Sequence, residues 1–138
     1  MDDVAKMLGA APIFAGLSDR HLKSLAKSSK VLSFPPDTRI VKQGEPGIAM
    51  YVILSGSAEV RQGPKVLSRL NAGQFFGEMT LVDGLPRSAD VVAVGSAQCA
   101  VLNRWEFWGI ARAEPEILES IMREMARRLR DANKALTE

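Results

Sequence analysis

The stretch FFGEMTLVDGLPRSA, residues 75–89, interrupts a chain that otherwise alternates short β-favouring runs with turns. Its residues 78–82 have the length of a single helical turn, which Gly77 opens. The first turn of a helix presents backbone N–H groups that have no intrahelical acceptor, together with a partial positive charge. The stretch therefore predicts a helical turn between two strands, and this turn is a candidate site for an anion.

Polar side chains in and after this turn indicate the kind of anion. Arg87 follows the turn, and its planar guanidinium can hold two phosphate oxygens at once. Pro86 restrains the backbone before it, and Ser88 adds a hydroxyl donor. Glu78, at the start of the turn, can accept hydrogen bonds from a sugar hydroxyl. Together these residues predict a site for a sugar phosphate that carries a free hydroxyl.

Around this stretch, residues 31–103 divide into short strand candidates. Ala58 and Val60 alternate with polar neighbours, as in a strand that is buried on one face. Turn signals such as GEPG at 44–47 separate the candidates. Short strands at this regular spacing predict a mainly β chain, an antiparallel sandwich or jelly roll. The strand candidates are residues 31–34, 39–42, 50–54, 57–61, 66–70, 90–94 and 98–102.

Helices are expected before and after the β region. One covers residues 3–9, and Ser18 is a candidate N-cap for the next. Asn103 and Glu106 have the spacing of a capping box, and Pro115 suits the first turn of a last helix. We therefore expect a single domain over residues 1–138. Its parts are N-terminal helices at about 3–28, the β region at about 31–103 and C-terminal helices at about 104–136.

Composition excludes several classes of protein. The 138 residues carry 18 basic and 16 acidic side chains, and a net charge of +2 is too balanced for a dedicated binder of nucleic acid or of a membrane surface. The apolar runs are shorter than the roughly 20 residues that cross a bilayer. One cysteine, Cys99, and one histidine, His21, argue against a disulfide, a multi-cysteine or two-histidine metal site and a serine triad. We expect a small cytoplasmic domain without a metal site.

The motif FGEMTL at 76–81, followed by PRSA at 86–89, resembles the phosphate-binding cassette of the cyclic nucleotide-binding domain family. That family includes the catabolite activator protein, the regulatory subunits of cyclic-nucleotide-dependent kinases and cyclic-nucleotide-gated channels. The resemblance extends over about residues 12–135. Outside the cassette, which spans 76–89, it rests on PIFAGLS at 12–18, Gly44, Gly47, MYVI at 50–53 and Gly56.

The resemblance implies an eight-stranded antiparallel β-roll, or double-stranded β-helix, with N-terminal helices and a C-terminal two-helix lid. It implies that Arg87 binds a cyclic phosphate with support from Ser88, and that Glu78 binds the ribose 2′-hydroxyl. The backbone of Gly77, Met79 and Thr80 would line the same pocket. Thr80 stands where the family usually has Ala or Gly. Serine rather than threonine at position 88 favours cAMP, with cGMP as the alternative ligand, and no further cofactor is implied.

The last helix carries one apolar stripe along its length. Either this stripe packs on the domain itself, or part of it forms the seam of a homodimer, as the corresponding helix does in the catabolite activator protein. Because this helix covers the base in family members, Arg128 and Asn133, which flank the stripe, are candidates for contacts to a purine. The stripe consists of Leu118, Ile121, Met122, Met125, Leu129, Ala132 and Leu136.

Several side chains also have a plainer interpretation. Glu78 and Arg87 could form an ion pair with each other across the loop, and an exposed ion pair contributes little to stability. Tyr51, Trp105 and Trp108 are expected to pack in the core or between helices rather than to stack on a base. Cys99 is expected to be buried and inert, and His21 to lie on the solvent side of its helix.

The leading hypothesis is a non-catalytic module that senses a cyclic nucleotide and transmits binding through movement of its C-terminal helix. The alternative is a degenerate fold that acts as an interaction or dimerisation scaffold without nucleotide. A phosphodiesterase is disfavoured because no His or Asp cluster is available for a metal. Relatives that bind DNA carry a helix-turn-helix after the long helix, where this sequence stops, so we expect no binding of nucleic acid or membrane by the chain itself. The output would then pass to an effector domain or protein.

Overall fold

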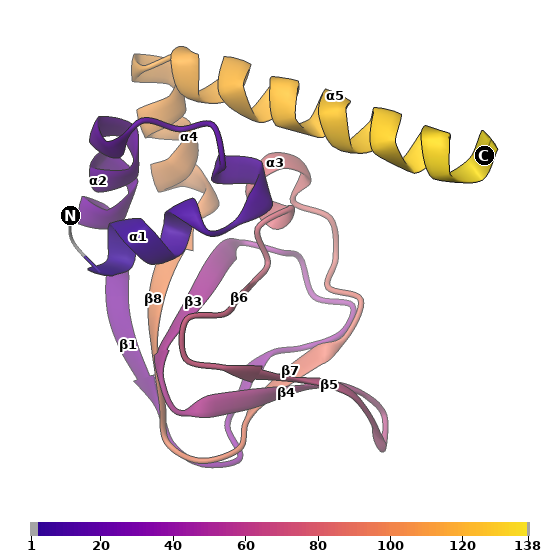
Figure 1. The fold of residues 1–138 in the computed structure, drawn as a ribbon. Helices are drawn as coiled ribbons and strands as arrows, with labels where there is room; N and C mark the ends of the chain where they lie inside the picture. The colour runs from indigo at the N-terminus through magenta and orange to yellow at the C-terminus, as the bar shows by residue number, and fades with distance from the viewer. Residues whose placement is uncertain (1–2, 138) are drawn as a thin grey trace.

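The described residues, 3–137, form eight strands in two four-stranded antiparallel sheets in the computed structural model (Figure 1). One sheet has the order β1-β8-β3-β6 and the other the order β2-β7-β4-β5. The predicted antiparallel β-roll is confirmed. The strands are β1 (Lys30–Phe34), β2 (Arg39–Val41), β3 (Ala49–Ser55), β4 (Ser57–Gln62), β5 (Lys65–Asn71), β6 (Phe75–Phe76), β7 (Asp90–Ala93) and β8 (Ala97–Asn103).

The central strand β3 is buried on both faces, which explains its continuous apolar run. Met50 and Val52 belong to the core beneath the helices, whereas Tyr51 and Ile53 belong to the core between the sheets. Strand β8, which pairs with β3 in the same sheet, alternates in the same way, and its Cys99 is the register partner of Ile53. Cys99 is buried as expected, and burial raises the pKa of its thiol to about 11.

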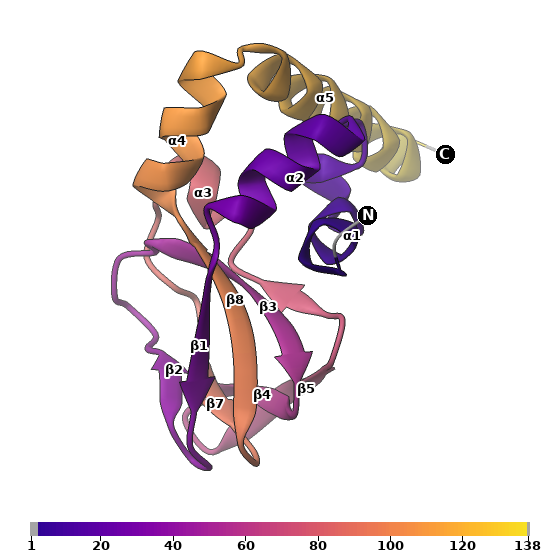
Figure 2. The same cartoon turned by 90° about the vertical axis from the view of Figure 1, so that its left-hand side faces the viewer.

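The helices collect over one end of the roll, as Figure 2 shows, and their core includes residues of β3 and β8. Two predicted N-caps are confirmed. The hydroxyl of Ser18 accepts from the backbone N–H of His21 at 3.2 Å, and the side chain of Asn103 accepts from that of Glu106 at 2.9 Å. The helices are α1 (Asp3–Gly9), η1 (Pro12–Phe14), α2 (Asp19–Lys27), α3 (Thr80–Asp83), α4 (Arg104–Ala113) and α5 (Glu116–Thr137).

His21 does not lie on the solvent side of α2, so that expectation was wrong. Its exposed fraction is 7%, and its Nε2 lies 3.9 Å from Oε1 of Glu114, which also accepts a hydrogen bond from Arg20. The physical reason is helical spacing, because His21 precedes the buried Leu25 by four residues and shares its face.

The long helix α5 is packed over its first half alone. Ile117 and Ile121 are buried in the helical core, and Leu118 and Met125 pack against it. From residue 126 to residue 137 every side chain is exposed, and the helix extends beyond the body of the domain (Figure 1). The interpretation that the whole stripe packs on the domain is therefore wrong for Met122, Leu129, Ala132 and Leu136. Over the described residues, no helix combines the length and the apolar character that a membrane crossing requires.

Candidate functional site

Gly77 determines the path of the chain at the start of the predicted cassette. Its φ is +82°, in the left-handed region, and a Cβ at this position would lie 2.7 Å from the carbonyl oxygen of Ala49 and would also meet Nη1 of Arg87. The backbone conformation and the close approach both require a residue without a side chain. Gly77 therefore allows β6 to end directly beside the arginine.

The helical turn after Gly77 begins later than the sequence predicts. Helix α3 covers Thr80–Asp83, so Glu78 and Met79 precede it in a turn that closes with a 3.2 Å hydrogen bond from Thr80 N to Gly77 O. The predicted turn at 78–82 is wrong by two residues at its start. The start of a single helical turn depends on individual hydrogen bonds such as this one, and the local sequence does not show which of them form. Strand β6 was not predicted for the related reason that two residues are too short for a pattern.

The Arg87 side chain is held by a backbone carbonyl and an aromatic ring. Its Nη2 donates to the carbonyl oxygen of Ala49 at 2.5 Å, and its guanidinium lies over the ring of Tyr51 at 5.9 Å. Tyr51 in turn stacks on Phe76, with ring centroids 4.8 Å apart and planes 4° apart. These contacts keep the guanidinium in one orientation.

No ion pair neutralises Arg87 among residues 3–137, so the surface pair with Glu78 is not formed. Burial lowers the pKa of Arg87, and the nearby Tyr51 and Glu78 oppose that shift. Arginine nevertheless stays charged in proteins. The site thus holds a half-buried cation that donates to a backbone carbonyl and has no counter-ion in the part of the chain that the structure describes.

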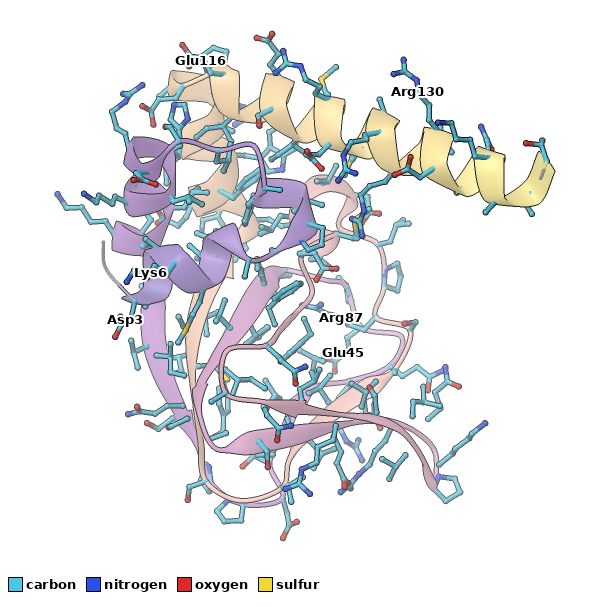
Figure 3. The ribbon with its side chains drawn as sticks, viewed as in Figure 1. Asp3, Lys6, Glu45, Arg87, Glu116 and Arg130 are labelled. Carbon is cyan, nitrogen blue, oxygen red and sulfur yellow. The ribbon has the colours of Figure 1, made fainter. Side chains whose placement is uncertain are left out.

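Backbone hydrogen bonds fix the loop that carries Arg87. The loop between β2 and β3 runs beside it, with Arg87 N donating to Glu45 O at 2.9 Å and Gly44 N donating to Arg87 O at 2.8 Å. Figure 3 shows Glu45 and Arg87 close together beneath α3. Gly47 N donates to Leu85 O at 3.2 Å, which extends the contact along both segments. Segments about 40 residues apart in sequence therefore position the arginine together.

Two of the hollows that Arg87 lines differ in character. The first, of about 280 Å³, is lined by Gly77, Glu78, Met79, Thr80, Asp83, Leu85, Pro86, Arg87 and Ser88. The second, of about 140 Å³, is lined by Phe76, Gly77, Arg87, Ser88 and Ala89 together with Val41, Val60 and Val91. The structure thus brings together the six cassette residues predicted from the sequence. The arrangement can hold an anion beside an apolar surface.

The predicted cassette residues differ in how they face the hollow. Thr80 is buried, and both its hydroxyl and its methyl group fill the space beside Gly47, where a Cβ would meet Oγ1 and would lie 2.6 Å from the methyl carbon. Ser88 and Met79 are exposed, and Glu78 is half-buried. The valines of the second hollow were missed as site residues. Alternation placed Val60 on a buried face, but no sequence signal indicates which cavity a buried strand residue lines.

Arg128 and Asn133 are not brought to this group. Both lie on the exposed part of α5, where the labelled Arg130 points away from the roll (Figure 3). Their contact with a base stays a prediction. Trp105 is 63% exposed, contrary to expectation, whereas Trp108 is partly buried and donates from Nε1 to Leu81 O at 2.7 Å. Residues 3–137 contain no group of three or more His, Cys, Asp or Glu that could hold a metal ion.

Comparison with known proteins yields consistent matches. A family model described as "Cyclic nucleotide-binding domain" matches residues 31–114. The chain is 29% identical to a CRP-like cAMP-activated global transcriptional regulator of Mycobacterium tuberculosis, over 100% of this chain and 62% of the regulator. It is 33% identical to a cyclic nucleotide-gated potassium channel of Mesorhizobium japonicum, over 92% of this chain and 35% of the channel. The chain therefore spans less than two thirds of the length of these relatives.

A solved structure extends the similarity to the whole fold. The N-terminal domain of a transcriptional regulator from Streptomyces coelicolor A3(2) is 27% identical and superposes with a TM-score of 0.85. The match covers 94% of each chain. Sequence and structure comparisons thus point to the same family as the cassette motif.

Proposed function

The chain belongs to the cyclic nucleotide-binding domain family, and we propose that it is a non-catalytic sensor whose pocket binds cAMP. The observation that carries this proposal is Arg87, a half-buried guanidinium that has no ion-pair partner among the described residues and lines both a polar and an apolar hollow. An anion that fills the hollow would supply the missing counter-charge. A cyclic phosphate offers two oxygens for a bidentate contact.

In this proposal, different cassette residues bind different parts of the ligand. Arg87 and the hydroxyl of Ser88 bind the cyclic phosphate, with the backbone of Gly77, Met79 and Thr80 lining the pocket beside it. Glu78 accepts from the ribose 2′-hydroxyl. The support for these roles is that all six residues line one hollow. Because the Thr80 methyl group packs beside Gly47, its replacement of Ala or Gly need not obstruct the ligand.

The apolar hollow supports a place for the base. Val41, Val60 and Val91 line a hollow that shares Gly77, Arg87 and Ser88 with the polar cassette hollow, so a nucleotide can place its charged and apolar parts on matching surfaces. Serine at position 88 favours cAMP over cGMP. The Mycobacterium tuberculosis relative is named as cAMP-activated, which agrees with this choice.

Signal output is proposed to pass through movement of α5, with Arg128 and Asn133 meeting the base in a closed state. A ligand can shift this helix only if it contacts the helix differently in the two states. The exposed Met122, Leu129 and Leu136 support a further role for α5 as a surface for a second copy or for an effector. A cytoplasmic location stays a prediction.

Calorimetric titration with cAMP and with cGMP tests the proposal. The wild-type chain should bind cAMP more tightly than cGMP, and Arg87→Ala should weaken binding at least tenfold, since a charge-assisted contact to a buried phosphate contributes about 2–5 kcal/mol. Arg69→Ala is the matched control, because Arg69 lies exposed on β5 and donates to Ser57. Equal affinity of wild type and Arg87→Ala would reject the assignment. Binding of neither nucleotide would favour the scaffold alternative.

A further inference from the structure

Helix α3 is too short to hold its own geometry. It has four residues, Thr80–Asp83, and ends at Gly84, whose φ is +63°. The last carbonyl groups of a helix have no intrahelical donor, and a single turn lacks the cooperative hydrogen bonds that stabilise longer helices. The turn that forms one wall of the cassette hollow therefore depends on donors from elsewhere in the chain.

Those donors come from two side chains of α4. Arg104 donates from Nε to Thr80 O at 2.9 Å and from Nη2 to Val82 O at 3.4 Å. Trp108 donates from Nε1 to Leu81 O at 2.7 Å. Residues 104 and 108 are four apart and share one face of α4, so together they bind three successive carbonyls of α3.

The end of α3 is shaped around this contact. A Cβ at Gly84 would lie 2.9 Å from Cζ of Arg104, so the left-handed backbone and the guanidinium both require glycine there. The backbone of Arg104 is fixed as well, because its N–H donates to Ile48 O at 2.8 Å. The next carbonyl, Ala49 O, accepts from Arg87. The successive residues Ile48 and Ala49, where β3 begins, thus bind both Arg104, the first residue of α4, and Arg87.

We propose that Arg104 and Trp108 are positioning residues that set the affinity of the cassette for its cyclic nucleotide by holding α3 in place, an inference that rests on the proposed function. Neither side chain is among those that line the cassette hollow. They line a different one of about 390 Å³ with Trp105 and Arg112. Their effect on the ligand is therefore transmitted through the carbonyls of residues 80–82.

The test compares variants that remove these donors with variants of residues that make no such bond. Trp108→Phe keeps an aromatic ring but removes the N–H, and Arg104→Met removes the guanidinium but keeps much of its stem. Trp105→Phe on the same helix and Arg69→Met on β5 are the matched controls, since both residues are exposed. Affinity for cAMP is measured by calorimetry under conditions in which circular dichroism shows every variant to be folded. Amide exchange at residues 79–84 is followed in the ligand-free protein.

Loss of a single neutral hydrogen bond predicts about threefold to tenfold weaker binding for Trp108→Phe, with a larger loss for Arg104→Met. Both variants should also exchange faster at residues 79–84, and both controls should match wild type in affinity and exchange. A purely structural role would lower the denaturation midpoint and leave the affinity of the folded protein unchanged, and that result would overturn the proposal. If exchange in α3 does not respond to either variant, the positioning contact is refuted whatever the affinity.

The same experiment separates this inference from the proposed function. If wild type binds cAMP and Arg87→Ala does not, while Trp108→Phe and Arg104→Met bind as wild type, the function stands and the positioning role fails. If wild type binds neither nucleotide, the proposed function fails and the effect on affinity fails with it. Amide exchange in that case still shows whether α4 holds α3.

Discussion

The shortest and the longest α-helix of the described chain are stabilised in opposite ways. Helix α3 has four residues, and its turns, carbonyls and flanking glycines are all engaged by other segments: the 44–49 region, Arg87 and α4. Helix α5 has 22 residues, and all the side chains of its second half are exposed. There, ion pairs within the helix join Arg127 to Glu124 at 2.8 Å and to Asp131 at 3.5 Å. The candidate site therefore includes a helix whose local structure is weak and which other segments hold in place.

The contrast within α5 itself should produce the largest effect on stability. Ile121→Ala removes a buried side chain from the helical core and should lower the free energy of unfolding by about 2–5 kcal/mol. Leu129→Ala, two turns later, removes a side chain that is 64% exposed and should change it by less than about 0.5 kcal/mol. Urea denaturation of the two variants measures both values. A large cost for Leu129→Ala that grows with protein concentration would show that a second copy covers the end of α5.

Substitution of two glycines tests how far α3 and the segment that precedes it depend on tertiary contacts. Gly77 and Gly73 both have positive φ, +82° and +90°, but a Cβ at Gly73 meets nothing within 4 Å. Gly73→Ala should therefore cost only the backbone strain, about 1–2 kcal/mol. Gly77→Ala should cost more than about 2 kcal/mol and should also weaken cAMP binding, because the new methyl group displaces Arg87. Denaturation and calorimetry measure the two quantities, and equal behaviour of the variants would show that close approach to Arg87 is unimportant.

The smallest effect is expected at Arg127. This side chain is exposed, and its partners lie on the same helix, so the ion pairs contribute little after solvent screening and side-chain entropy are counted. Arg127→Ala should have the denaturation midpoint of wild type within experimental error, at both low and high salt. A clear, salt-dependent loss of stability would contradict this expectation. It would mean that the ion pairs of Arg127 stabilise the exposed half of α5.

Much of the fold could be predicted because short-range signals are strong there. The caps at Ser18 and Asn103 depend on a side chain and an N–H three residues away, and both formed as expected. The strands of the roll follow from alternation and turn residues. His21 shares the helical face of Leu25, but how far that face is covered depends on what α2 packs against, and its burial was therefore misjudged. The outer half of the α5 stripe was misjudged in the same way, because periodicity shows which face of a helix is apolar but not how far a partner surface extends.

The sequence by itself determined the class of fold and the residues of the cassette, because both depend on patterns within a few positions: strand alternation, cap spacing and the run from Gly77 to Ser88. The tertiary structure alone decided what makes those residues a site. It placed the carbonyl of Ala49 and the ring of Tyr51 against Arg87, added Val41, Val60 and Val91 beside it, and supplied the donors of Arg104 and Trp108 to α3. The hydrogen bonds among these contacts join residues 38, 24 and 27 positions apart. Hydrogen bonds and packing at that separation depend on the path of the whole chain, which no local pattern encodes.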